Sequence, residues 1–298
     1  MPKKVLLENQ ISKNKRNTVF ICALMFFLLF GVISVIGYIW FGEPLYATII
    51  GFPVALVYII VSYSFSVKSV LAATRARPVD LGVRKEKLLD NKVEELAIAA
   101  GLPKPKVYIQ DSSDINAFAT GKKYEDSVVC VTRGALDKLS GQELEGVLAH
   151  EMSHIQNRDI LLATVIVGVV GSIALLSEIL LRSFIWGNHS NRDNKSGYII
   201  VIGIVFAILA PIFARLTYLA ISRNREYLAD ASGAHMSRNP EGLASALEKI
   251  KADLPDDPKG SKTAASLYIA NPFSRVKKAS LWSTHPPIDE RVKRLRNM

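Results

Sequence analysis

Residues Ser140–His154 read SGQELEGVLAHEMSH, and this segment decides the fold around it. Its first four residues form a capping box, because the Ser140 hydroxyl can accept a hydrogen bond from an exposed backbone amide while Glu143 reaches back to the cap amide. We therefore predict a helix that starts at about Gly141 and includes the rest of the segment. No proline lies between Gly141 and the apolar run at 160–181, so the sequence permits this helix to continue into that run without a break.

The predicted helix carries two histidines four residues apart, His150 and His154. Residues at this spacing lie on one face of a helix, about 6 Å apart, so both imidazoles can bind one zinc ion. Glu151 then projects beside them toward a metal-bound water, as the general base of a hydrolase would. We predict one zinc ion per chain. The simpler alternative is a pair of surface histidines.

A catalytic zinc site needs a third protein ligand. Glu226 is the best candidate, because Arg223, Glu226 and Asp230 fall on one face of the helix predicted for 223–236. In that arrangement Glu226 coordinates the metal, and Asp230 accepts an N–H bond from a ligating histidine and fixes its ring. Asp159 and Asp230 are rival ligands.

The chain contains long apolar runs of about the length needed to cross roughly 30 Å of hydrocarbon. We predict four transmembrane helices, at 19–40, 45–65, 160–181 and 198–221. They divide the chain into an N-terminal tail with a first hairpin (1–66), a second hairpin (160–221), and a soluble domain formed by 67–159 and 222–298.

Basic residues cluster before the first run and after the second, which indicates that both flanks and the soluble domain are cytoplasmic. The net charge of +10 is concentrated there, and attraction to a lipid bilayer explains it better than nucleic-acid binding, for which we find no motif. Cys22 and Cys130 fall in different environments, so they form no disulfide framework or thiolate metal site.

The sequence of the soluble domain predicts several helices and one small sheet. Helical spacing covers 83–100 and stops at Gly101, and later helices are predicted at 223–236, 239–252 and 287–298. Three β-prone pieces lie at 106–110, 115–120 and 127–132. The fold class is therefore a mainly α membrane protein with an α+β domain that carries a small β-sheet.

Peptide hydrolysis develops an oxyanion, which needs a donor besides the metal. His285, in the segment STHPP (283–287), is the candidate, with Arg291 as support. Spacing alone does not distinguish this role of His285 from a structural one.

The chain resembles the HtpX-like membrane zinc metalloproteases, relatives of the eukaryotic prenyl-peptide processing endoprotease. The resemblance covers essentially the full length and includes ordered motifs at 116–121, 150–154, 223–230 and 283–286. It implies a gluzincin-like domain with zinc on His150, His154 and Glu226. It further implies Glu151 as base, Asp230 and Arg223 as supporting residues, and His285 in contact with the transition state.

The resemblance also implies that Asn116, Ala117, Phe118 and Ala119 form an edge strand that holds an extended polypeptide by strand addition. Family membership would place the protein in the bacterial cytoplasmic (inner) membrane, as a multi-pass protease with its active site on the cytoplasmic side. Its substrates would be misfolded membrane proteins, cleaved in quality control under stress. The sequence does not specify an oligomeric state.

Two other interpretations compete. An intramembrane protease of the site-2 type embeds its histidine pair within a span, but the helix before Ile160 carries too many charges to lie in lipid. A membrane scaffold or holdase with a structural zinc site is the non-enzymatic alternative. Such sites usually close with four protein ligands, often cysteines, and Glu151 would have no role in one.

Overall fold

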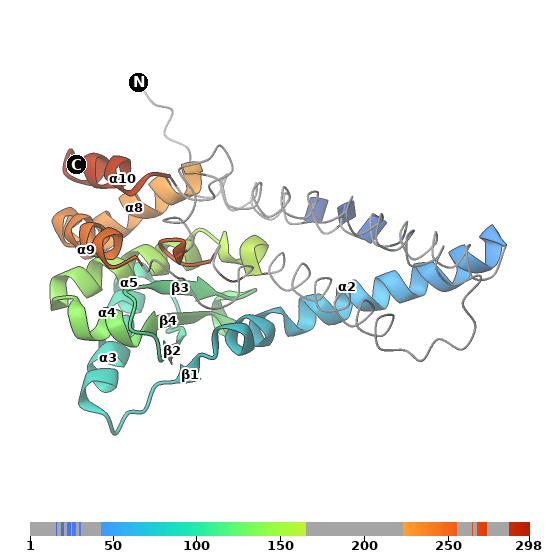
Figure 1. Cartoon of the computed structure of the whole chain (residues 1–298), viewed down its shortest axis with the longest axis horizontal. Coiled ribbons are helices and arrows are strands. Elements are labelled where there is room, and N and C mark those ends of the chain that lie inside the picture. Colours follow the sequence, from blue (N-terminus) through green and yellow to red (C-terminus); the bar gives the residue numbers. More distant parts are fainter. Residues whose placement is uncertain are drawn as a thin grey trace, which may run out of the picture.

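The computed structural model of the chain describes residues 43–164, 223–254, 267–272 and 286–298, with residue 264 and isolated positions between 16 and 30. A body of helices and one small sheet lies at one end of the molecule. The long helix α2 (Pro44–Thr74) extends away from this body (Figure 1).

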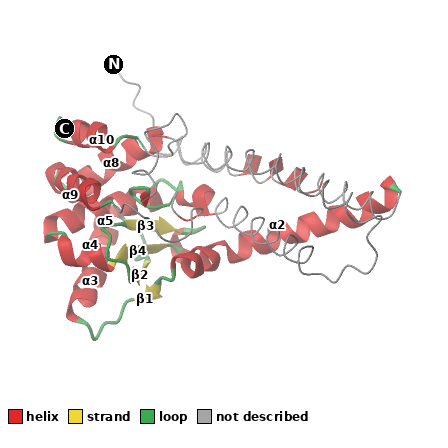
Figure 2. Ribbon diagram, in the orientation of Figure 1, coloured by secondary structure: helices red, strands yellow, loops and turns green. Residues whose placement is uncertain are grey.

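The sheet has four strands in the order β1-β2-β4-β3 (Figure 2). They are β1 (Arg77–Pro78), β2 (Lys106–Gln110), β3 (Ala117–Thr120) and β4 (Val128–Thr132). Strands β2 and β4 are parallel, whereas β1 and β3 pair antiparallel with β2 and β4 respectively. The three predicted strands are confirmed, although β3 begins later than predicted, and the two-residue β1 was not predicted. Strand β3 lies at one edge of the sheet.

The helices of the body include the predicted ones in their predicted order, and two short elements between residues 124 and 138 that were not predicted. They are α3 (Arg84–Ala100), the 3-10 turn η1 (Tyr124–Asp126), α4 (Arg133–Lys138), α5 (Gly141–Gln156), α8 (Arg223–Ser237), α9 (Pro240–Asp253) and α10 (Ile288–Leu295). The capping box is confirmed, because the Ser140 hydroxyl accepts from the Glu143 N–H and the Glu143 carboxylate accepts from the Ser140 N–H. Helix α5 contacts β3, α3, α8 and α9, so it forms the centre of the body.

Helix α2 has the length and composition of a membrane span. Its stretch Thr48–Thr74 reaches a mean hydropathy of 1.9 and is the one candidate span among the described residues. Large apolar side chains such as Leu45, Ile49 and Phe65 are exposed along α2, which suits contact with lipid hydrocarbon. The helix includes the predicted run 45–65 and continues beyond it.

Part of the first apolar run lies beside α2. The rings of Phe26 and Phe30 meet that of Phe52 edge-on, with centroids 5.3 and 5.8 Å apart. These contacts agree with the predicted first hairpin. Most of the predicted spans 160–181 and 198–221 lies outside the described residues, so the count of four spans stays a prediction.

Helix α2 joins the sheet through a very short connection. Arg75 caps the helix with a left-handed backbone (φ 53°), and β1 follows two residues later. Near this end Val70 packs in a buried cluster with Phe118, Cys130 and Tyr268. The apolar helix is therefore fixed to one face of the sheet by side-chain packing, while α3 and α5 cover the other face and α9 packs on α5.

Helix α5 does not continue into the third apolar run, so the unbroken helix that the sequence permitted is wrong. Arg158 adopts a left-handed backbone (φ 54°) before helical structure resumes at residue 160. This conformation costs a non-glycine residue about 1 kcal/mol. Tertiary contacts hold the turn, because the Arg158 guanidinium lies 4.1 Å from the centre of the Tyr124 ring and Asp159 bonds to His154.

Two glycines allow other helices to cross α5 at close range. A Cβ on Gly146 of α5 would lie 2.6 Å from the backbone nitrogen of Leu243 in α9. A Cβ on Gly233 of α8 would lie 2.8 Å from the backbone nitrogen of His150. Real Cβ contacts are longer, so α8 can approach α5 this closely only because residue 233 has no side chain.

We predict that Gly233→Ala lowers stability by about 2 kcal/mol, because the added methyl group must push α8 away from α5. Gly141→Ala is the matched control, since a Cβ there meets nothing within 4 Å. Alanine favours a helix intrinsically, so the control should leave stability unchanged or raise it. Thermal unfolding of both variants measures the difference, and equal stability of Gly233→Ala and the wild type would contradict the close crossing.

Candidate metal centre

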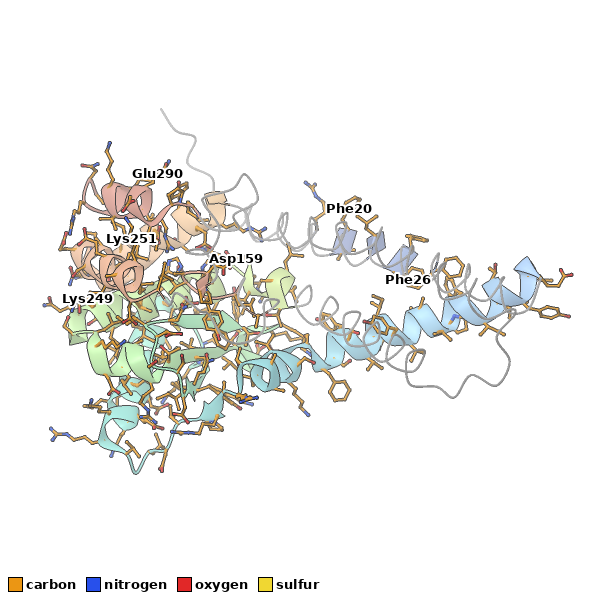
Figure 3. The ribbon with its side chains drawn as sticks, in the orientation of Figure 1. Phe20, Phe26, Asp159, Lys249, Lys251 and Glu290 are labelled. Carbon is orange, nitrogen blue, oxygen red and sulfur yellow. The ribbon has the colours of Figure 1, made fainter. Side chains whose placement is uncertain are left out.

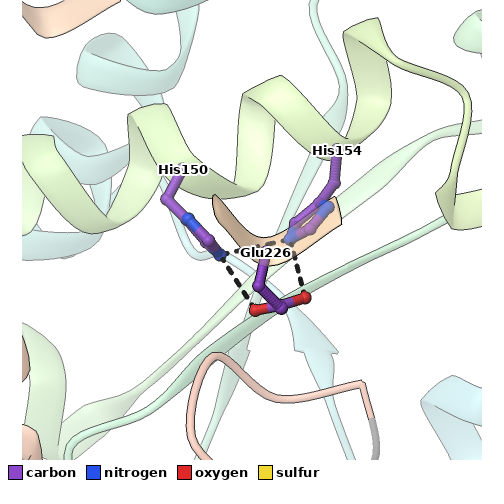
Figure 4. A group of neighbouring side chains, drawn as sticks. All are labelled: His150, His154 and Glu226. Atoms are coloured by element: carbon purple, nitrogen blue, oxygen red, sulfur yellow. Dashed lines mark hydrogen bonds and ion pairs between the residues drawn. The ribbon is translucent and has the colours of Figure 1, made fainter. Parts of the chain in front are cut away.

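Three side chains from two helices converge at the crossing of α5 and α8. His150 and His154 project from one face of α5, and Glu226 projects from the first turn of α8 (Figure 4). One donor atom of each lies within 4.8 Å of the other two. The two histidine Nε2 atoms are 3.1 Å apart, and the Glu226 oxygens lie 3.9 Å from Nε2 of His150 and 3.7 Å from Nε2 of His154.

A carboxylate holds the opposite side of each imidazole ring. Nδ1 of His150 lies 3.0 Å from Oδ1 of Asp230, and Nδ1 of His154 lies 3.1 Å from both oxygens of Asp159 (Figure 3). An N–H at each Nδ1 that donates to its carboxylate leaves the lone pair of Nε2 facing Glu226. Asp159 and Asp230, the rival ligands considered from sequence, thus occupy orienting positions in this geometry.

The neighbouring carboxylates attract positive charge to the cluster. Burial alone would lower the pKa of His154, but Asp159, Glu226 and Glu151 raise it to about 10. Burial dominates at His150 and lowers its pKa. Burial would likewise raise the pKa of Asp230, yet Arg291 and His150 bring it to about 2. Acids that raise the pKa of a buried imidazole also favour the binding of a metal cation at the same place.

Glu151 is almost completely buried, at 1 % exposure, directly beside the two histidines. Burial, followed by the charge of Glu226, raises the pKa of its carboxyl group to about 7. The carboxylate lies near the backbone of Ala119 in β3, which lowers this pKa slightly. Its Oε1 atom has no hydrogen-bond partner among the described residues, which is unusual for a buried acid.

Arg291 of α10 is fully buried behind the cluster. Its Nε and Nη2 atoms donate to the two oxygens of Asp230 at 2.9 and 2.7 Å, and its Nη1 donates to the backbone carbonyl of Ile269 at 2.9 Å. Nη2 also lies 3.4 Å from Nε2 of His150. In this position Arg291 fixes Asp230, and through it the ring of His150.

The residues fit a tetrahedral metal ion. Nitrogen and oxygen ligands at typical zinc distances lie about 3.3 Å from one another. The 3.1 Å between the two Nε2 atoms is close to this value, while the two Glu226 oxygens lie farther, one 3.9 Å from His150 and the other 3.7 Å from His154. The two histidines, the acid and the unpaired oxygen of Glu151 also match the donor set of a site that keeps one position open.

The other predicted site residues lie in several places. Asn116 and Ala117–Ala119 are buried at the edge strand β3, next to Glu151. Arg223 begins α8, but its side chain is not described, and His285 lies outside the described residues. Arg291 was expected from sequence only as support for His285. Its burial could also have been predicted, because it falls on the apolar face of α10 formed by Ile288, Val292 and Leu295.

Comparison with known proteins decides the family. The profile of peptidase family M48 matches residues 84–298. The chain belongs to peptidase family M48. It is therefore a metalloendopeptidase, a hydrolase whose substrates are polypeptides, as the resemblance to HtpX-like proteases predicted.

Curated relatives of this M48 peptidase match along nearly its whole length. A protease HtpX homolog of Thermoanaerobacter pseudethanolicus is 44% identical over 306 residues, covering 100% of this chain and 99% of the relative. Another, of Dictyoglomus turgidum, is 46% identical over 290 residues and covers 97% and 93%. The crystal structure of S. mikatae Ste24p is 20% identical, with a TM-score of 0.47, and the match covers 89% of this chain and 61% of that one.

We predict that Arg291→Lys weakens the binding of Zn²⁺ by about 10- to 100-fold, because lysine cannot donate to both oxygens of Asp230 and to Ile269 together. Arg296→Lys on the same helix is the control, since Arg296 makes exposed ion pairs with Glu241 and Glu248. Competition with a chromophoric chelator measures the affinity. Equal zinc affinity of Arg291→Lys and the control would show that Arg291 does not hold His150 in place for metal binding.

Proposed function

We propose that this M48 peptidase uses one zinc ion, bound by His150, His154 and Glu226. Asp230 orients His150, and Arg223 at the start of α8 belongs to the same supporting group. The convergence of the three donors within 4.8 Å supports this ligand set. The buried Glu151 carboxylate, with one oxygen unpaired beside the cluster, is the observation that carries the proposal of catalysis, since a structural zinc site would give it no role.

When bound, zinc supplies Lewis-acid chemistry, which acidifies water and polarises a carbonyl group. Glu151 takes the proton from the attacking water and later delivers it to the amine of the leaving peptide. A carboxyl pKa of about 7 suits both transfers, because the group can accept and release a proton near neutral pH. His285 is proposed to donate to the oxyanion, and β3 to contact the extended polypeptide through Asn116–Ala119.

We further propose a multi-pass protein of the bacterial cytoplasmic membrane, with the site on the cytoplasmic side and misfolded membrane proteins as substrates. Contacts near β3 support a site close to the bilayer. Lys122 donates to the Ser64 carbonyl of the apolar helix α2 at 3.1 Å. The Thr164 hydroxyl, at the start of the third apolar run, bonds to Thr120 and to the Gly121 N–H.

We expect Glu151→Gln to retain zinc and to cleave an unfolded substrate such as casein at least about 100-fold more slowly, because glutamine cannot accept the proton. Glu145→Gln is the matched control on α5, where Glu145 makes a half-exposed ion pair with Lys92. Zinc content and casein cleavage are measured on the same preparations. Full activity of Glu151→Gln would exclude Glu151 as the base, and a scaffold with a structural zinc would cleave in no variant.

The second hairpin can be tested with single cysteines in a chain that lacks Cys22 and Cys130. We expect Ser190→Cys, in the loop between runs 160–181 and 198–221, to react in spheroplasts with a membrane-impermeant maleimide. Glu125→Cys, exposed in η1 on the body, should react only after lysis. Labelling of both positions only after lysis would show that these two runs do not cross the membrane.

A further inference from the structure

The edge of β3 that faces away from β4 carries backbone groups that can pair with a further segment. In the antiparallel pair with β4, the Thr132 N–H donates to the Asn116 carbonyl. Because hydrogen bonding alternates along such a strand, the backbone groups of Ala117 and Ala119 point to the open edge. These are the groups that an added strand would use.

The chain itself already occupies this edge. The Ile269 N–H donates to the Ala117 carbonyl at 2.9 Å, and the Glu151 carboxylate lies near the Ala119 backbone. The segment Leu267–Ala270, which we name the strap, therefore lies beside β3 and contacts its edge through one backbone hydrogen bond. It comes from the part of the chain between α9 and α10.

Side chains on three elements hold the strap. The Asn116 amide donates to the Ala270 carbonyl at 2.9 Å, and Arg291 donates to the Ile269 carbonyl. The Tyr268 hydroxyl donates to Gln110 at 2.7 Å, while its ring meets the Phe118 ring edge-on at 5.2 Å. Arg291 also holds Asp230, so the strap is bonded to the same side chain that supports the metal centre.

We propose that the strap is an internal competitor of the substrate: it occupies the Ala117 carbonyl in the resting protein, and an extended polypeptide binds to β3 by displacing it. This inference rests on the proposed function and adds a step of regulation to it. The exchange is balanced at the Ala117 carbonyl, because a substrate N–H replaces the Ile269 N–H there. The bonds from Asn116 and Arg291, and the burial of Ile269 and Ala270 in the core, favour the bound strap. The side-chain anchors of the strap then set how often the edge is open.

The competition predicts the sign of a mutational effect. Apparent substrate affinity is the intrinsic affinity multiplied by the fraction of molecules whose edge is open. Weaker anchors increase this fraction, so they should improve binding. Tyr268→Phe removes only the hydrogen bond to Gln110, and Tyr268→Ala also removes the ring contact with Phe118. We expect kcat/KM for casein to rise in the order wild type, Tyr268→Phe, Tyr268→Ala, by at least threefold in total and mainly through KM, with zinc content unchanged.

Cys130→Ala is the control, because Cys130 packs in the same buried cluster as Tyr268. It removes packing without removing a hydrogen bond of the strap, so its kcat/KM should stay at the wild-type value. A strap that only supports the fold would give the opposite result, with kcat/KM falling or staying level in both Tyr268 variants. The milder Tyr268→Phe keeps the test decisive if Tyr268→Ala does not fold.

Hydrogen–deuterium exchange gives a second readout. In full-length, zinc-loaded Glu151→Gln, the amides of 267–270 should exchange slowly alone and faster when β-casein saturates the protein. Unchanged exchange on saturation would overturn the inference while leaving the proposed function intact, provided that the wild type cleaves casein. If zinc-loaded wild type does not cleave casein, the proposed function fails, and the competition fails with it.

Discussion

The close crossing of α8 over α5 is the constraint on which the metal centre depends. Gly233 meets the backbone of His150, so the start of α8 is directed at the face of α5 that carries both histidines. One turn of α8 then supplies Glu226 to the Nε2 side of the imidazoles and Asp230 to the Nδ1 side of His150. A wider crossing of the two helices would move both Glu226 and Asp230 away from the imidazole rings.

Charge within the body is arranged around that crossing. Four carboxylates, those of Glu151, Asp159, Glu226 and Asp230, surround two imidazoles, and Arg291 is the cation that faces Asp230 from behind. Buried charges are tolerated only when they are paired or bind a metal. Arg225 also lies near Asp159 and Glu226, so four acids face two arginines, and binding of a divalent ion would balance the difference.

Local signals in the sequence predicted much of this arrangement. The Ser140 capping box, the four-residue spacing of the histidines and the helical register of Glu226 and Asp230 depend only on neighbours in the chain. The left-handed turn at Arg158, the burial of Arg291 and the pairing of Ile269 with Ala117 depend on contacts between distant segments. The periodicity of apolar residues does not report contacts between distant segments. The position of Arg291 on the apolar face of α10 did, however, indicate its burial.

The two-residue connection between α2 and β1, together with the packing of Val70 on the sheet, couples the apolar helix to the sheet. A tilt of that helix would therefore also tilt the edge of β3. The thickness of the surrounding bilayer would then influence the height of β3 and of the metal centre above the membrane surface.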